Sequence, residues 1–219
     1  LLDNRIVDSI VIADLHPIDE AVCTLRMREL LISRAVRFEQ VDVRGAISLS
    51  SKESVDLVIN LAAIHREPGH QPNEYYETNL LGAENVCGWA VSQACNTIIF
   101  TSSISPYGPA EEVKNENSIP VPVTAYGCSK LVAEKIHGTW QAQDQKSRRL
   151  IILRPGVVFG AGERGNVSRL VKAVLNGYFV FMGNRATRKA GIYVKELCCA
   201  LTWVLNDKSA PGAVLFNMS

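Results

Sequence analysis

The run Thr97-Ile-Ile-Phe-Thr-Ser102 is apolar and β-branched almost throughout and does not alternate with polar residues. A strand with this pattern is buried on both faces, as in a parallel sheet covered by helices. Five further β-branched runs occur in the 219-residue chain, several of them also apolar throughout, at Ser9–Ala13, Val36–Val43, Val55–Ala63, Leu150–Arg154 and Ala213–Asn217. The quoted run therefore predicts a central strand of a parallel sheet.

Helix-like stretches separate these runs, at Ile18–Arg34, Pro72–Ala94, Ala125–Gln143, Asn166–Asn176 and Val194–Leu205. Alternation of strand and helix predicts an α/β fold, in which right-handed crossovers wrap a parallel sheet on both sides. The expected fold class is thus a doubly wound, Rossmann-like sheet. A chain of this length fits a single large domain, which we expect to span residues 1–219.

Composition narrows the classes of partner. The 23 basic and 22 acidic residues are mixed along the chain and give a net charge of +1, so neither a nucleic-acid nor a membrane surface is indicated. The six cysteines form no CxxC pair and the four histidines are scattered, which predicts no metal site and core cysteines in a reducing compartment. There is no apolar run of about 18 residues and no signal peptide at the start, so we expect a cytoplasmic protein.

Tyr126-Gly-Cys-Ser-Lys130 stands at the start of a predicted helix. Residues four apart share one helical face, so the phenol and the ammonium lie side by side. A tyrosine with a pKa of about 10 is a poor base at neutral pH, and a neighbouring ammonium favours its phenolate. Ser103 follows the quoted strand, and a hydroxyl at the carboxyl end of a strand points into the ligand crevice. We predict Tyr126, Lys130 and a hydroxyl at this strand end, such as that of Ser103, as the catalytic set.

With Tyr107-Gly108 between them, these residues resemble the extended short-chain dehydrogenase/reductases, the NAD-dependent epimerase/dehydratase family, and especially sugar-nucleotide enzymes such as the UDP-glucose 4-epimerases. The family pattern is Ser-Ser-x-x-x-Tyr-Gly followed by YxxxK. Matched backward from Tyr107, this pattern implies that Ser103 is the catalytic hydroxyl. The resemblance extends over nearly the whole chain. The resemblance implies NAD as cofactor and hydride transfer at a hydroxyl-bearing carbon, with Tyr126 moving the proton. It also implies that only part of a small substrate lobe is present, within about residues 160–195.

The resemblance also implies a set of cofactor contacts. Asp14 would hold the adenosine ribose and repel a 2′-phosphate, which favours NAD over NADP. Lys130 would bind the nicotinamide ribose, and Asn79 would steady the backbone of the site. The remaining positions would grip the adenine, let the cofactor lie close over a strand end, or pack against the nicotinamide: Asp42, Val43, Leu61, Ala62, Ala63, His65, Pro155, Gly156 and Val157.

The substrate contacts match less well. Sugar-nucleotide enzymes of the family usually place Asn where this chain has Val157, and an arginine near the position of Lys189. Arg185, Arg188 and Lys189 form a basic group that fits a phosphate clamp or a solvated loop. Ser103 and Ile104 would meet the sugar. Family 4,6-dehydratases carry Thr-Asp-Glu where this chain has Ser103-Ile104-Ser105, so the acid and base for water elimination are missing.

Three functions remain open. The first is an NAD-dependent epimerase, and the second is a net dehydrogenase or reductase of a non-nucleotide hydroxy or keto compound, which Val157 favours. The third is a non-catalytic NAD-binding module, against which the intact catalytic set argues. The resemblance also implies a homodimer formed through Pro72–Ala94 and Ala125–Gln143. Its outward positions should then be apolar; Leu131, Ile136 and Trp140 supply some of these, and core packing explains the same residues.

The first strand is unusual in this fold. Ser9–Ala13 already ends at the ribose-binding Asp14, and no Gly-rich turn precedes it. In the expected strand order, a strand is then missing between Ser9–Ala13 and Val55–Ala63. We expect about 20 further N-terminal residues in the native protein, to supply that strand and its phosphate-binding turn. The sheet should show a gap, or a foreign segment, between these two strands.

Overall fold

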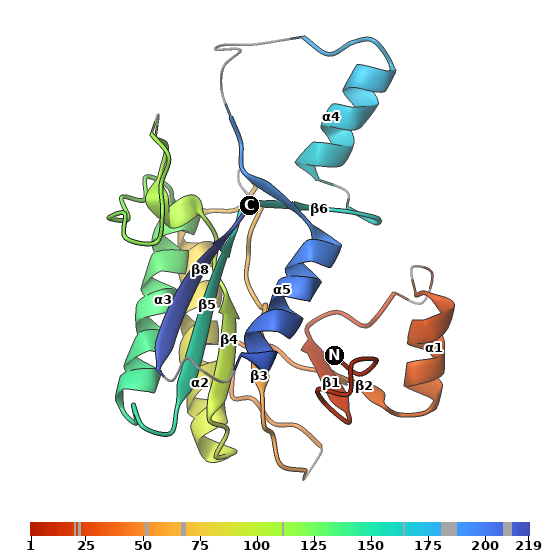
Figure 1. The fold of residues 1–219 in the computed structure, drawn as a ribbon, viewed down its shortest axis with the longest axis vertical. Coiled ribbons are helices and arrows are strands. Elements are labelled where there is room, and N and C mark those ends of the chain that lie inside the picture. The colour runs from red at the N-terminus through yellow and green to blue at the C-terminus, as the bar shows by residue number, and fades with distance from the viewer. Residues whose placement is uncertain are drawn as a thin grey trace.

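The structure is a computed structural model that describes residues 1–19, 21, 23–50, 53–66, 69–110, 112–163, 165–180, 188–207 and 212–219. Strands and helices alternate along these residues (Figure 1). The strands are β1 Ile10–Asp14, β2 Val36–Gln40, β3 Val58–Asn60, β4 Thr97–Thr101, β5 Arg149–Pro155, β6 Val157–Phe159, β7 Gly191–Tyr193 and β8 Ala213–Met218. The helices are α1 Leu25–Ile32, α2 Pro72–Ser92, the 3₁₀ turn η2 Ser105–Tyr107, α3 Ala125–Ala142, α4 Asn166–Leu175 and α5 Val194–Asn206.

The main sheet is parallel, with strand order β3-β4-β5-β8, which confirms the predicted α/β fold class. Helices α2 and α3 cover one face and α5 covers the other (Figure 1). Side chains alternate between these two layers. On β4 and β5, Ile98, Phe100, Leu150 and Ile152 pack against α2 and α3, and Ile99, Ile151 and Leu153 pack against α5. Burial on both faces explains why the sequence of these strands is apolar throughout.

The first two strands of the chain, β1 and β2, form a separate sheet. Strand β1 pairs with β2 in parallel from Ile10↔Val36 to Asp14↔Gln40. Among the described residues, no strand pairing connects this two-stranded sheet with β3. The predicted gap between β1 and β3 is therefore confirmed, and one edge of each strand lies unpaired.

A second small parallel pair extends beyond the end of β5. Strand β6 pairs with β7 from Val157↔Gly191 to Phe159↔Tyr193, and α4 follows β6. Helix α4 stands apart from the main sheet in Figure 1. Helix α4 and strand β7 fall within about residues 160–195, where the resemblance implies part of a substrate lobe, and β6 directly precedes that range.

Several boundaries differ from the prediction. The helix expected at Ile18–Arg34 is shorter, because the Thr24 hydroxyl accepts a hydrogen bond from the N–H of Met27 at 3.2 Å and caps α1 there. The strands expected at Val55–Ala63 and Val36–Val43 are also shorter, ending at Asn60 and Gln40. The apolar pattern of Val55–Ala63 reflects burial as well as strand pairing, since Val55 packs against the core although it precedes β3.

Other expectations need correction at single residues. Trp140 is 2 % exposed and lies in the core with Ile136 packed against it, so it is not on the outward face of α3. Of the six free cysteines, Cys87 and Cys95 are buried, whereas Cys198 and Cys199 are exposed on α5. No helix among the described residues is long and apolar enough to cross a membrane.

Candidate functional site

The site begins at the carboxyl end of β4. Beyond the strand, the N–H of Ser102 donates to the carbonyl of Leu153 at 2.7 Å, and the N–H of Ile104 donates to the carbonyl of Pro155 at 3.1 Å. These bonds hold the turn after β4 against the end of β5. Within the turn, the Ser103 hydroxyl donates to the Ser105 hydroxyl and accepts from the Ser105 N–H, both at 3.1 Å. Ser103 is thus fixed at the strand end, as predicted from the fold.

Helix α3 begins beside this turn. The Thr124 hydroxyl caps its first turn by accepting from the N–H of Gly127 at 3.1 Å. At Gly127, a β-carbon would come within 2.8 Å of the Ser105 carbonyl oxygen, so a glycine lets α3 approach the turn closely. Tyr126 is therefore adjacent to the Ser103–Ser105 turn. Its ring centroid lies 6.1 Å from that of Tyr75 on α2.

Lys130 reaches from α3 to the same strand end. Its ammonium donates to the Thr101 carbonyl at 2.7 Å and lies 4.4 Å from the centroid of the Phe100 ring. The side chain is 2 % exposed. Burial lowers the pKa of Lys130 to about 8, and the Glu134 carboxylate opposes this shift. An ammonium in this position is a strong electrostatic partner for a nearby phenolate.

A buried ion pair connects β5 with α3. Arg154 on β5 contacts Glu134 on α3 through two hydrogen bonds of 2.6 and 2.8 Å, and both side chains are 4 % exposed. Glu134 also accepts a hydrogen bond from the Ser102 hydroxyl at 2.5 Å. The Arg154 guanidinium lies 4.6 Å from the centre of the Tyr107 ring. This network joins β4, β5, α3 and η2 around the site, and the sequence analysis did not predict it.

The segment after β3 carries the predicted small residues. Leu61 is 64 % exposed, Ala62 and His65 are exposed, and Ala63 is half-buried. Asn79 holds the far end of the segment: its carbonyl accepts from the N–H of Ile64 at 2.8 Å. Its amide donates to the Ile64 carbonyl at 3.1 Å and to the Ser129 hydroxyl at 2.9 Å. Asn79 thereby links α2, this segment and α3.

Asp14 is exposed at the carboxyl end of β1. Its carboxylate accepts a hydrogen bond from the N–H of His16 at 2.9 Å, as a turn aspartate does, and the rest of its acceptor capacity faces solvent. A carboxylate at the end of a parallel strand stands where a nucleotide ribose can donate to it.

Asp42 and Val43 differ from Asp14 in their partners. The Asp42 carboxylate is bound by the Arg44 side chain at 2.7–3.0 Å, and these hydrogen bonds lower the pKa of Asp42. The Val43 carbonyl accepts from Asn85 at 2.8 Å. Both residues therefore already have partners on the protein, and a ligand at Asp42 would share the carboxylate with Arg44.

The predicted nicotinamide-packing residues form the turn between β5 and β6. Gly156 donates from its N–H to the Met218 carbonyl at 2.8 Å, and Val157 donates to the Ala190 carbonyl at 3.0 Å. A β-carbon on Gly156 would come within 2.6 Å of the Ala190 oxygen, so this position requires glycine. Pro155 contacts the turn after β4 through Ile104, which brings this end of β5 to the Ser103 side of the site.

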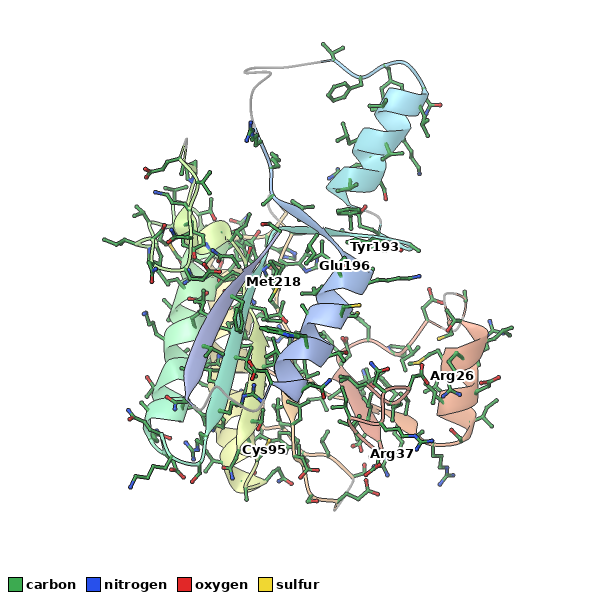
Figure 2. The ribbon with its side chains drawn as sticks, viewed as in Figure 1. Arg26, Arg37, Cys95, Tyr193, Glu196 and Met218 are labelled. Atoms are coloured by element: carbon green, nitrogen blue, oxygen red, sulfur yellow. The ribbon has the colours of Figure 1, made fainter. Side chains whose placement is uncertain are left out.

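The basic group lies before β7. Arg188 and Lys189 are exposed and directly precede Ala190, while Arg185 falls outside the described residues. Between β6, β7 and α4 lies an open pocket of about 360 Å³, which includes Glu163, Lys172 and Tyr193 in its lining. Figure 2 shows Tyr193 and Glu196 together where β7 leads into α5. The sequence analysis missed this pocket, although Gly160, Gly162 and Gly165 between a strand and a helix are a GxGxxG signal for a tight turn.

Two other residues missed by the sequence analysis are Asn60 and His137, which meet in the core beneath the segment after β3. In the described part of the chain there is no group of three or more His, Cys, Asp or Glu that could hold a metal ion.

Comparison with known proteins gives consistent similarities. The NAD-dependent epimerase/dehydratase family matches residues 12–218. The N-acetyl-alpha-D-glucosaminyl-diphospho-ditrans,octacis-undecaprenol 4-epimerase of Escherichia coli O157:H7 is 34% identical over 177 residues, covering 80% of this chain and 53% of the relative. The GDP-6-deoxy-D-talose 4-dehydrogenase of Aggregatibacter actinomycetemcomitans is 27% identical over 192 residues, covering 83% and 63%.

Among solved structures, MoeE5 in complex with UDP-glucose and NAD has a similar fold, with a TM-score of 0.77. The match is 24% identical and covers 100% of this chain and 70% of MoeE5. The chain spans about half the length of the Escherichia coli relative. Since the family match extends over nearly all of the sequence, this chain belongs to the NAD-dependent epimerase/dehydratase family.

Proposed function

We propose that the protein is an NAD-dependent epimerase that inverts a hydroxyl-bearing carbon of a sugar nucleotide or a related sugar diphosphate. The observation that carries the proposal is the meeting of the Ser103 turn with the first turns of α3: Gly127, next to Tyr126, lies against the Ser105 carbonyl, and the Lys130 ammonium donates to the Thr101 carbonyl. The Escherichia coli relative, a 4-epimerase by name, supports the reaction type.

The residues present fit NAD at several points. Asp14 offers an exposed carboxylate at a strand end, and Leu61 and Ala62 offer exposed apolar surface next to the gap-facing strand β3. Lys130 is a buried cation near the nicotinamide-side residues Pro155 and Gly156, which lie against the same turn. Held by these residues, NAD would supply the acceptor and donor of a hydride at the substrate carbon.

The chain's own residues then move the proton. Ser103 donates to or accepts from the reacting substrate oxygen, and the Tyr126 phenolate takes the hydroxyl proton as the carbon is oxidised. The Lys130 charge favours that phenolate. The oxidised sugar then rotates in the site and is reduced on its other face. Tyr126 returns the proton to the substrate oxygen as the hydride returns to the carbon, so the epimer leaves and Tyr126 is a phenolate again.

The substrate's phosphates need cations, and the structure offers them near the β6–β7 pair. Arg188 and Lys189 precede β7 on the exposed side, and Lys172 lines the pocket beside α4. The pocket has largely apolar walls with one cation, Lys172, and one carboxylate, Glu163, which already accepts hydrogen bonds from Ser168. Such a lining suits a nucleotide or another diphosphate-linked group when Arg188 and Lys189 add their charges. We assign the substrate end distant from the reacting sugar to this pocket.

The test is Tyr126→Phe, which removes only the ionisable hydroxyl. With UDP-glucose and UDP-N-acetylglucosamine as probe substrates, epimer formation followed by NMR should fall by roughly 10²–10⁴-fold, while NAD affinity stays within about twofold. The matched control is Tyr76→Phe, because Tyr76 is a partly exposed tyrosine on α2. Retention of most of the turnover in Tyr126→Phe would remove this residue from the mechanism.

The second candidate is a net dehydrogenase, which the Aggregatibacter relative supports by its name. The substrate in the name of that relative is a sugar nucleotide, so the relative supports net oxidation only. Val157, 36 % exposed beside the nicotinamide-side turn, is the residue of this chain that favours a non-nucleotide substrate. The same assay separates the two: NADH absorbance that rises in proportion to substrate consumed indicates a dehydrogenase. Constant absorbance with a changing sugar NMR spectrum indicates an epimerase, and neither change with bound NAD indicates a non-catalytic module.

We further propose that the working protein is a cytoplasmic homodimer assembled through α2 and α3. Free cysteines at all six described positions are compatible with a reducing compartment. Helices α2 and α3 pack against each other and leave Leu81, Val91 and Val132 exposed on their outer faces.

A further inference from the structure

A histidine is completely buried beneath the cofactor-facing segment. His137 on α3 is 0 % exposed, and its ring stacks on Phe100 with centroids 4.1 Å apart and an interplanar angle of 14°. Its Nε2 lies 3.2 Å from the side-chain amide nitrogen of Asn60, the last residue of β3. Asn60 is 5 % exposed. Two polar side chains are thus enclosed in an otherwise apolar core, where each needs a partner.

The hydrogen bonds permit one arrangement of protons. Nδ1 of His137 lies 2.8 Å from the Ala133 carbonyl, which can only accept, so Nδ1 carries the proton. Nε2 therefore accepts from the Asn60 amide. The Asn60 carbonyl oxygen in turn accepts from the N–H of Ala62 at 3.1 Å, which fixes the orientation of the amide. Burial lowers the pKa of His137 to about 4, in agreement with a neutral ring at physiological pH.

This chain of bonds runs from α3 to the segment that would lie against the cofactor. Ala62 lies at its near end, held through Asn60 to His137. Ile64 lies at its far end, held through Asn79 to Ser129. Both anchors are on α3, the helix that also carries Tyr126 and Lys130. The segment is therefore fastened twice to the catalytic helix.

We propose that Asn60 and His137 form a positioning pair, which sets the height of Leu61–Ala63 relative to the catalytic helix and so shapes the surface that receives the cofactor. The inference rests on the proposed function. His137 touches neither substrate nor cofactor; it acts through Asn60 and Ala62. The Phe100 ring contacts both His137 and the Lys130 ammonium, so one aromatic side chain packs against both members of the site.

An ordinary core histidine would behave differently when changed. Loss of a purely structural hydrogen bond lowers stability and leaves ligand affinity alone. Loss of a positioning bond releases Ala62 and weakens NAD binding even in molecules that are folded. NAD affinity measured on folded protein therefore separates the two roles.

The decisive variants are His137→Leu and His137→Gln. Leucine fills a similar volume but accepts no hydrogen bond, whereas the glutamine side-chain oxygen can stand where Nε2 stands and accept from Asn60. We expect His137→Leu to raise the NAD dissociation constant about tenfold, measured by fluorescence titration, with kcat at saturating NAD within about threefold of wild type. His137→Gln should restore most of the affinity.

Ile98→Val is the matched control, because Ile98 is 0 % exposed, belongs to the same core cluster as Phe100 and lies opposite Val58 in the sheet, not opposite Asn60. It should lower the melting temperature without changing NAD affinity. If His137→Leu does not fold, Asn60→Ala tests the same bond from the strand side and should also raise the dissociation constant about tenfold. Wild-type NAD affinity in either His137→Leu or Asn60→Ala would overturn the positioning role.

Amide hydrogen exchange gives a readout independent of activity. The Ala62 N–H should exchange faster in His137→Leu than in wild type or His137→Gln, because its acceptor is no longer held. Equal exchange in all three proteins would overturn the proposal. A wild-type protein that binds no NAD would instead overturn the proposed function, and this inference with it.

Discussion

At the scale of single residues, Lys130 works under conflicting demands. The proposed mechanism needs its charge, but 2 % exposure makes the charge costly to the fold. Its pKa in the folded protein, about 8, lies below the ordinary lysine value of 10.5. The unfolded chain thus binds more protons between about pH 8 and pH 10.5, so the stability of the protein rises with pH across this window. The cost of Lys130 is fully present below about pH 8.

Lys130→Met tests this cost. Methionine keeps the length of the side chain and removes the buried charge, so we expect the free energy of unfolding to rise by about 1–2 kcal/mol at pH 7, with catalysis lost. The gain should shrink as the pH increases from about 8 to 10.5. Urea denaturation at several pH values measures it, with exposed Lys135→Met on the same helix as control. Lower stability of Lys130→Met at pH 7 would mean that the bond to Thr101 outweighs desolvation.

Asp14→Ala tests the choice of cofactor. Loss of a charge-assisted acceptor should weaken NAD binding by about 10–100-fold, and loss of the repelling charge should narrow the difference between NAD and NADP. Fluorescence titration with both cofactors measures the two effects. Asp19→Ala is the control, because Asp19 accepts the same kind of turn hydrogen bond from Ala21. Unchanged discrimination in Asp14→Ala would assign ribose recognition to another group.

Site residues that are close together in the sequence could be predicted, whereas residues that meet only in the folded chain could not. Tyr126 and Lys130 are four positions apart on one helix, so the sequence shows them as a pair. Asn60 and His137 are 77 positions apart and meet only when β3 lies beneath α3. A lone histidine in an apolar helix carries no signal that distinguishes a positioning role from packing.

At the scale of elements, apolar runs located each predicted strand but did not give its ends. The ladder between β3 and β4 covers only Val58–Asn60 opposite Ile98–Phe100, so β3 is three residues long although β4 itself runs from Thr97 to Thr101. The short strands β6 and β7 were not predicted, because three-residue strands with little apolar alternation leave no periodic pattern.

The unpaired edge of β1 has a measurable consequence. The N–H of Ile10 donates to Ala35 on the β2 side, and the Asp14 carbonyl accepts from Val41 on the same side. Because successive backbone groups of a strand point in opposite directions, the amides of Val11 and Ala13 face the gap. We expect these two amides to exchange with solvent at least tenfold faster than that of Ile12, as measured by hydrogen-exchange NMR on residues 1–219.

Equal protection of Val11, Ile12 and Ala13 would contradict the open edge and show that another segment or a second copy pairs with β1 in solution. The control is β4, whose neighbours β3 and β5 pair with it on both sides. Successive amides of Ile98, Ile99 and Phe100 should therefore show no such alternation.

At the scale of the whole molecule, the outer faces of α2 and α3 lead to a prediction about assembly. Leu81 and Val91 on α2 are 45 % and 48 % exposed, and Val132 on α3 is 41 % exposed. We expect light scattering to give a dimer at micromolar concentration, and Leu81→Glu with Val132→Glu to give a monomer, because buried unpaired carboxylates are costly. Val174→Glu on α4 is the control. A wild-type monomer under these conditions would contradict the α2–α3 interface.

The overall topology was the most predictable level. A missing Gly-rich turn before Asp14 predicted a divided sheet, and the division between β1 and β3 was found. The position of α4 was not predictable. Its amphipathic pattern indicates that one face packs against another element, but it does not indicate which element that is.

The buried pair of Glu134 and Arg154 also constrains how this protein can change over generations. Replacement of either residue alone leaves an uncompensated charge in the core, at a cost of about 3–5 kcal/mol, a large share of the stability of a typical domain. Replacement of both by apolar residues of similar volume is far less harmful. Positions 134 and 154 are therefore expected to vary together: in related sequences, both residues should be kept or both should be replaced.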